Sequence, residues 1–127
     1  MDRGEPNIED QLRACLALLD GLEILRDPRS RFIAYVPVGS IKKGEKLAKS
    51  RALDCSVCHG ADLQGLGPVP GIAGRSPSYL ARQMFDMQVG ARHGEWAELM
   101  KPIVAKLTEE DLVNIVAYVS SRMPPGA

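Results

Sequence analysis

The segment CSVCHG, residues 55–60, constrains this chain more than any other part of its sequence. Cys55 and Cys58 lie three positions apart, and His59 follows the second thiol directly. At helical spacing the two sulfurs project to one side, and the imidazole falls within the same turn. The chain has 3 cysteines, so they cannot all pair, and two of them are too close together to staple a fold. A disulfide framework is therefore not expected.

The pattern C-x-x-C-H is the attachment signature of c-type haem. In this interpretation Cys55 and Cys58 form thioether links to the two porphyrin vinyl groups, and His59 is brought beneath the iron. Gly60 lets the backbone leave without colliding with the ring. Aromatic residues make up only 5% of the chain, so a large flat apolar group would help to complete its core. We therefore predict one covalently bound haem c with its iron.

Three other interpretations of the cysteines are weaker. A structural zinc site needs four ligands, and only His93 and Cys15 remain, neither at zinc spacing. A thioredoxin-like dithiol should begin a helix that follows a strand, and no segment alternates convincingly as a strand. The last alternative is a chance occurrence of the motif.

Length and charge exclude several classes of protein. The chain has 127 residues, the size of one domain, and its 16 basic and 16 acidic side chains cancel at pH 7. Overall charge therefore gives no reason to expect nucleic acid or an anionic membrane as partner. No apolar run approaches the length of a membrane span, and the opening MDRGEPNIED lacks the apolar core of a signal peptide. We expect a soluble polypeptide.

The first 40 residues contain no recognisable chemistry. Residues 8–25 have the apolar spacing of a helix, and two prolines then favour an extended linker up to residue 40. The stretch RACLALLDG resembles a damaged copy of LDCSVCHGA, with Cys15 in the place of Cys55. This part is either a remnant of a tandem haem domain or an amphipathic helix with one incidental buried cysteine.

The remainder of the chain predicts an all-α fold with about three core helices. The first begins near Ile41, turns Gly44, Leu47 and Ala48 inward, and leads to Cys55. Residues 60–74 hold five glycines and two prolines in fifteen positions, so they cannot form regular structure.

The other two core helices have clear terminal signals. Ser76 is the expected N-cap of a helix that has Pro77 at its first position and stops at Gly90. We expect a loop over residues 90–102. Thr108 then caps the last helix, which carries acidic residues in its first turn and ends before Pro124.

A haem iron held by one histidine needs a second ligand or stays open, and methionine is the usual partner in electron transfer. Met100 is the preferred candidate, because it is expected in an irregular loop, just before Pro102, that could cross the open haem face. His93 and Met87 are the alternatives. Met87 also fits a stripe with Met84 that is typical of core packing.

The stretch from about residue 41 to 121 resembles the class I c-type cytochromes, most closely the group that includes cytochrome c4 and c553-like proteins. The resemblance rests on three segments: CSVCHG, PGIAGRSPSYLARQMFDMQVGAR and LMKPIVAKLTEEDLVNIVAYVSS. It implies a cytochrome c fold around one haem, in which the first and last helices cross where Gly44 meets Tyr118. It also implies that the Pro70 carbonyl accepts the Nδ1 hydrogen of His59. The side chains that the resemblance suggests for haem propionate contacts are Arg75, Arg82, Arg92 and Trp96.

The resemblance further implies a one-electron carrier, not an enzyme, with both axial positions filled by His59 and Met100. Its partners would be redox proteins, such as a dehydrogenase, an oxidase or other cytochromes, with no nucleic acid and no insertion into a membrane. The family is exported, so a periplasmic location is expected although the chain shows no export signal. We divide the chain into an N-terminal extension (1–40), a cytochrome c domain (41–123) and a tail (124–127). One alternative is an electron-accepting haem domain or subunit of a dehydrogenase complex. Another is a haem protein whose Met100 detaches so that a ligand can bind the iron. A third is a haem-free helical interaction domain derived from a decayed cytochrome.

Overall fold

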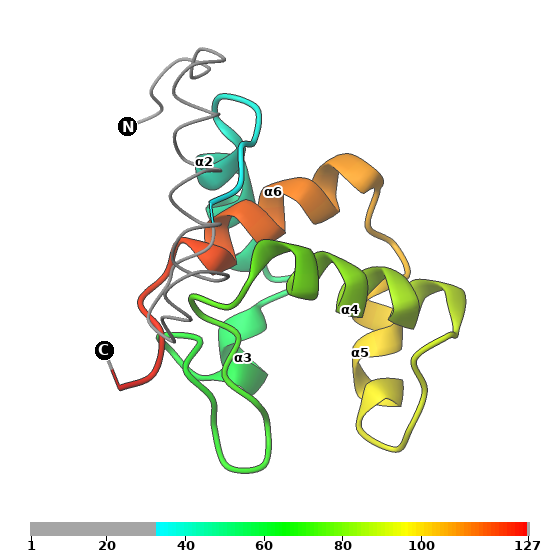
Figure 1. The fold of residues 1–127 in the computed structure, drawn as a ribbon. Helices are drawn as coiled ribbons and strands as arrows, with labels where there is room; N and C mark the ends of the chain where they lie inside the picture. Colours follow the sequence, from blue (N-terminus) through cyan, green and yellow to red (C-terminus); the bar gives the residue numbers. More distant parts are fainter. Residues whose placement is uncertain (1–32, 127) are drawn as a thin grey trace, which may run out of the picture. The chain divides into compact units, whose positions relative to one another are not determined.

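The computed structural model describes residues 33–126, and this part of the chain is helical. Among these residues there is no extended strand, only an isolated bridge between Leu66 and Val69. The all-α class is therefore confirmed (Figure 1). The predicted N-terminal helix and Cys15 lie outside the described residues. The described helices are α2 (Ser40–Ala48), α3 (Cys55–His59), α4 (Pro77–Val89), α5 (Ala97–Val104) and α6 (Glu109–Ser120).

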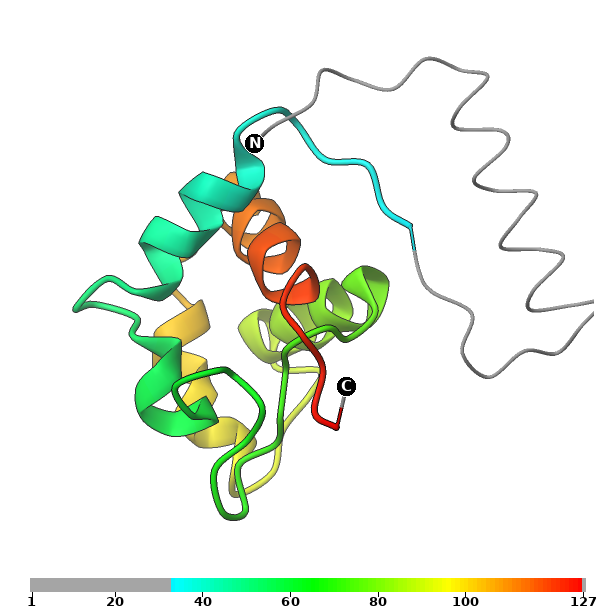
Figure 2. The same cartoon turned by 90° about the vertical axis from the view of Figure 1, so that its left-hand side faces the viewer.

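Helices α2 and α6 cross in close contact, as Figures 1 and 2 show. The crossing depends on Gly44, since a Cβ atom placed there would overlap the Asn114 carbonyl oxygen and lie 2.9 Å from Cβ of Tyr118. The contact that the resemblance implied between Gly44 and Tyr118 is present. Helix α2 ends at Ala48, however, and a turn separates it from Cys55.

Helix α6 forms the centre of the core. Its N-cap Thr108 shares a capping box with Asp111, in which each side chain binds the backbone N–H of the other residue, at 3.1 and 3.0 Å. The apolar residues Leu112, Ile115, Val116 and Val119 of α6 are buried, and Tyr118 is buried with them. Ala48 of α2 and Leu80 of α4 belong to the same apolar cluster. The last helix is thus the surface on which α2 and α4 pack.

Helix α4 begins and ends where the sequence predicts. The Ser76 hydroxyl accepts a hydrogen bond from the Tyr79 N–H, Pro77 occupies the first helical position, and Gly90 closes the helix at φ 80°. A glycine is favoured there because side chains strain a left-handed backbone. Helix α4 packs against both α6 and α5.

The predicted loop is present over residues 90–96, but the prediction was wrong for residues 97–102, because α5 begins at Ala97 and includes Met100. The segment AELMK consists of strong helix formers, and Pro102 does not prevent the helix. The backbone carbonyl of Lys101 still accepts the Ala105 N–H at 3.0 Å, so the last helical turn is formed. Met100 is therefore presented by a helix that packs on α4, where we had expected a loop.

The glycine-rich segment between α3 and α4 is irregular, as predicted, but it is well fixed. Leu63 is buried at φ 58°, and its carbonyl oxygen accepts the N–H groups of Ile72 and Ala73 at 2.8 and 2.9 Å. The Gly74 N–H donates to the Val119 carbonyl at 3.0 Å, which ties the segment to α6. The path of the loop past α3 is thereby determined.

Candidate functional site

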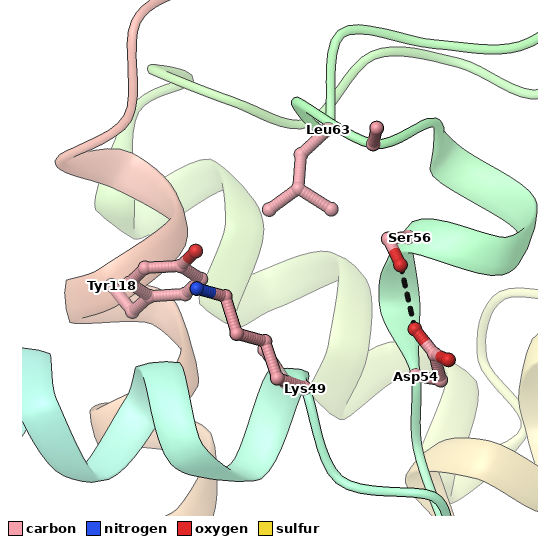
Figure 3. Close-up of a pocket in the computed structure, with 7 residues that line it drawn as sticks. Lys49, Asp54, Ser56, Leu63 and Tyr118 are labelled. Carbon is pink, nitrogen blue, oxygen red and sulfur yellow. Dashed lines mark hydrogen bonds between the residues drawn. The ribbon is translucent and has the colours of Figure 1, made fainter.

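Cys55 and Cys58 lie on α3, a helix of little more than one turn. The Ser56 hydroxyl donates to Oδ1 of Asp54 at 2.6 Å and so steadies the entry to this helix (Figure 3). Both thiols are free; Cys55 is partly buried and Cys58 is exposed. Burial raises the pKa of the Cys55 thiol, which keeps it protonated in the isolated polypeptide. The two sulfurs are thus available on one short helix.

The imidazole of His59 is buried and held in one orientation. Only 8% of the residue is exposed, and its Nδ1 lies 2.7 Å from the Pro70 carbonyl oxygen. A carbonyl can only accept, so Nδ1 carries the hydrogen and donates it. The lone pair of the neutral ring is then on Nε2, the atom left to bind a metal. The hydrogen bond implied by the resemblance is therefore present.

Gly60 ends α3, and the polypeptide itself supplies a reason for a glycine there. Its φ is 90°, and a Cβ atom there would lie 2.8 Å from the Gly65 carbonyl oxygen. The Gly65 N–H donates to the His59 carbonyl at 2.8 Å, so the loop folds back tightly over the end of α3. The requirement for glycine comes from this turn of the polypeptide itself.

The three candidates for the second axial position lie in different surroundings. Met100 is half-buried on α5, Met87 is buried in the core, and His93 is exposed between α4 and α5. Burial in the core supports the packing role for Met87. In Figures 1 and 2, α3 and α5 both lie below α6, so the helices that carry His59 and Met100 occupy the same side of it.

The predicted propionate contacts stay predictions. Arg75, Arg82 and Arg92 are exposed, and Nε of Arg75 donates to the Gly71 carbonyl at 2.8 Å. Trp96 is 64% exposed at the N-cap of α5. Sequence reasoning missed a different residue, Gln88, whose amide binds two backbone carbonyls at the end of α5.

A cavity of about 290 Å³ lies beside α3, between Lys49, Leu63 and Tyr118 (Figure 3). Neither His59 nor Met100 lines it, so it is not the place where these two residues would meet a metal. Within residues 33–126, no group of three or more His, Cys, Asp and Glu side chains is arranged to hold a metal ion.

Large apolar side chains are left exposed on each element near the predicted ligands. Val57 on α3, Leu66 in the following loop and Leu99 on α5 are 67%, 58% and 64% exposed. Two free thiols, an oriented imidazole and uncovered apolar surface together fit a covalently bound macrocycle with a central metal.

Comparison with known proteins agrees with this arrangement. The Cytochrome c family profile matches residues 41–122. The chain belongs to the cytochrome c family. Cytochrome c-554(548) of Halomonas halodenitrificans is 42% identical over 69 residues, which are 54% of this chain and 83% of that protein. The crystal structure of reduced cytochrome c4 from Pseudomonas stutzeri has a TM-score of 0.62 at 27% identity, and the match covers 72% of this chain and 53% of that one.

A further relative is a thiosulfate dehydrogenase electron acceptor of Stutzerimonas stutzeri, 32% identical over 80 residues, or 61% of this chain. This chain spans only 36% of that relative's length. Membership of the family brings a covalently bound haem c with its iron, and the C-x-x-C-H arrangement required for it is present. No helix in the described part of the chain is long and apolar enough to cross a membrane.

Proposed function

We propose that this cytochrome is a one-electron carrier whose haem c is attached through Cys55 and Cys58 and ligated by His59 and Met100. The observation that carries the proposal is the hydrogen bond from His59 Nδ1 to the Pro70 carbonyl, which leaves Nε2 free beside the two thiols. The bound haem supplies an iron that accepts and releases one electron. Histidine with methionine is the ligand pair that raises the potential for this role.

Each element of the chain has a simple task in this function. The thiols of α3 tether the cofactor, and the Pro70 carbonyl holds the His59 ring and increases its basicity. Met100 on α5 would supply the second protein ligand, so no substrate would reach the iron and no acid or base would be needed. The buried side chains of α4 and α6 keep water away, and a low dielectric favours the less charged ferrous state.

We infer that the partners are other redox proteins, and that contacts with them are small and short-lived. The charges cancel over the whole chain, so association is not driven by a strong field. We place the mature protein in the periplasm, because haem c is attached outside the cytoplasm. Arg75, Arg92 and Trp96 stay the proposed contacts for the propionates.

A second candidate function is that of an electron-accepting subunit or domain of a dehydrogenase complex. One relative is named a thiosulfate dehydrogenase electron acceptor, which favours this candidate, and this chain covers only part of that protein. Electron transfer at the haem would be the same in both cases. Co-purification of a catalytic subunit with the cytochrome would support the second candidate.

The decisive experiment compares Met100→Ala with the parent holoprotein. We expect the ferric parent to show the sulfur-to-iron charge-transfer band and the ferrous parent to refuse carbon monoxide. Met100→Ala should lose the band and bind carbon monoxide readily. Met123→Ala is the matched control, because that side chain is 64% exposed beyond α6 and should leave both properties unchanged.

Retention of the band in Met100→Ala would show that another residue is the distal ligand. His93→Ala and Met87→Ala would then identify it. A parent that binds carbon monoxide as readily as Met100→Ala would favour an iron with an open position and so overturn the closed carrier.

A further inference from the structure

Helix α5 carries Met100 and contains strong helix formers, yet three features weaken it. It has 8 residues, the side chain of its N-cap Trp96 makes no capping hydrogen bond, and Pro102 lies inside it. Proline cannot donate the backbone hydrogen bond of that position, and helices this short are unstable in isolation. The position of α5 therefore depends on contacts from the rest of the domain.

Gln88 of α4 supplies such a contact at the C-terminal end of α5. Its side-chain Nε2 donates to the Val104 carbonyl at 2.7 Å and to the Leu107 carbonyl at 2.9 Å. The last carbonyls of a helix have no helical N–H partner. Here one amide group bonds both the Val104 carbonyl, at the end of α5, and the Leu107 carbonyl, in the connection between α5 and α6. Val104 is fully buried, and its carbonyl also accepts the Leu107 N–H at 3.1 Å. Loss of the amide would remove one of these two hydrogen bonds, and water could not replace it at a buried site.

The same corner is fixed on its other side by the capping box of α6, which starts at Thr108. Gln88 thus joins α4 to the short connection between α5 and α6. Met100 lies four residues before Val104, one helical turn away and on the same face of α5. A shift of Val104 would therefore carry the Met100 side chain with it.

We propose that Gln88 is a positioning residue that holds the Met100 thioether at the iron by fixing the end of α5. This inference rests on the proposed function, in which Met100 is the distal ligand. Gln88 acts through backbone carbonyls and touches neither Met100 nor the haem-binding motif in its hydrogen bonds.

Gln64 offers a matched comparison on the other side of the domain. Its Nε2 also donates to a backbone carbonyl, that of Met123, at 3.1 Å. It lies in the loop after α3 and holds the C-terminal tail. Loss of either glutamine removes amide-to-carbonyl bonding, but only Gln88 bonds to the end of the helix that carries Met100.

The test is an imidazole titration of the ferric holoprotein, since external imidazole competes with the thioether for the distal position. Gln88→Met keeps the length of the side chain and removes its donors, and it should bind imidazole about tenfold more tightly than the parent. Gln64→Met should stay within about twofold of the parent. Gln88→Lys restores a donor and should return the affinity toward that of the parent.

A folded Gln88→Met protein with the parent's imidazole affinity would overturn the inference. So would an equal increase in Gln64→Met, because the effect would then be general loosening. If Gln88→Met does not fold, Gln88→Asn is the substitute variant. Its side chain is shorter, so its imidazole affinity should rise by less than tenfold, and an unchanged affinity would also overturn the inference. The proposed function fails separately, if Met100→Ala keeps the charge-transfer band whatever Gln88 does.

Discussion

The Pro70 carbonyl reaches His59 because the backbone on either side of it is tightly constrained. The next residue, Gly71, passes so close to Gln64 that a Cβ atom there would lie 2.6 Å from the Gln64 carbonyl oxygen. The neighbouring Gly65 is bound to the end of α3. The orientation of one imidazole is thus set by close backbone contacts in the loop.

Gly71→Ala should therefore move the Pro70 carbonyl and weaken its hydrogen bond to His59. A less basic imidazole stabilises ferric iron less, so the reduction potential should rise. The overlap should also destabilise the protein by about 1–3 kcal/mol. Spectroelectrochemical titration of the holoprotein measures the potential, and denaturant unfolding measures the stability.

Gly67→Ala, in the same loop, is the control for Gly71→Ala. Its φ of 58° costs an alanine about 1–2 kcal/mol, but nothing lies within 4 Å of the added Cβ. It should lose some stability and keep the parent's potential. Equal potentials in Gly71→Ala and the parent would show that this loop position does not tune the imidazole.

Among whole elements, those with local signals could be predicted from the sequence. Ser76, Pro77 and Gly90 mark the ends of α4, and Thr108 with Asp111 marks the start of α6; each acts within one helical turn of its own position. Helix α5 was missed because its strong helix formers are followed by Pro102, which favours a loop, and because part of its support is not local. Gln88 bonds to its end from 16 and 19 residues away in the sequence, a relation that periodicity does not reveal.

The crossing of α2 and α6 gives a prediction at the same scale. Helix propensity alone would make Gly44→Ala stabilising by about 1 kcal/mol. The overlap with the Asn114 carbonyl should outweigh this gain, and we expect the unfolding free energy to fall by about 3 kcal/mol or the holoprotein not to assemble. Guanidinium unfolding followed by circular dichroism measures the change.

Lys46→Ala is the matched control on α2, because Lys46 is exposed. It should change the unfolding free energy by no more than about 0.5 kcal/mol. An equal unfolding free energy for Gly44→Ala and Lys46→Ala would contradict the prediction. It would mean that α2 and α6 are farther apart at Gly44 than in the structure.

At the scale of the molecule, the motif CSVCHG was enough to predict the cofactor, because thioether attachment requires two thiols and a histidine close together in the sequence. The distal side was less predictable. It is built by helices that the fold brings together, so sequence alone left Met100, Met87 and His93 open. In the structure Met87 is buried in the core, and Gln88 bonds to the end of α5, the helix that carries Met100.

Residues 39–126 belong to one compact unit of the chain, and contacts within it join its loops to α6. The loop after α3 is tied to α6 by Gly74 and to the C-terminal tail by Gln64, and Arg122 lies 5.0 Å from the centre of the Tyr118 ring. The family profile covers residues 41–122, inside the same limits. Both the haem-binding motif and its supports therefore belong to this part of the chain.

A chain without residues 1–38 should accordingly mature with haem c, keep the charge-transfer band and unfold within about 0.5 kcal/mol of the full chain. Deletion of residues 122–127 is the contrasting variant. It removes the Arg122 cation over Tyr118 and the carbonyl that Gln64 binds, which together should cost about 1–2 kcal/mol. Absorption spectra and denaturant unfolding of the two truncated holoproteins measure both effects. Two results together would contradict this prediction: the protein without residues 1–38 loses the charge-transfer band, and the C-terminal deletion leaves the unfolding free energy unchanged. The N-terminal part would then support the haem, and the domain boundary would have to be moved.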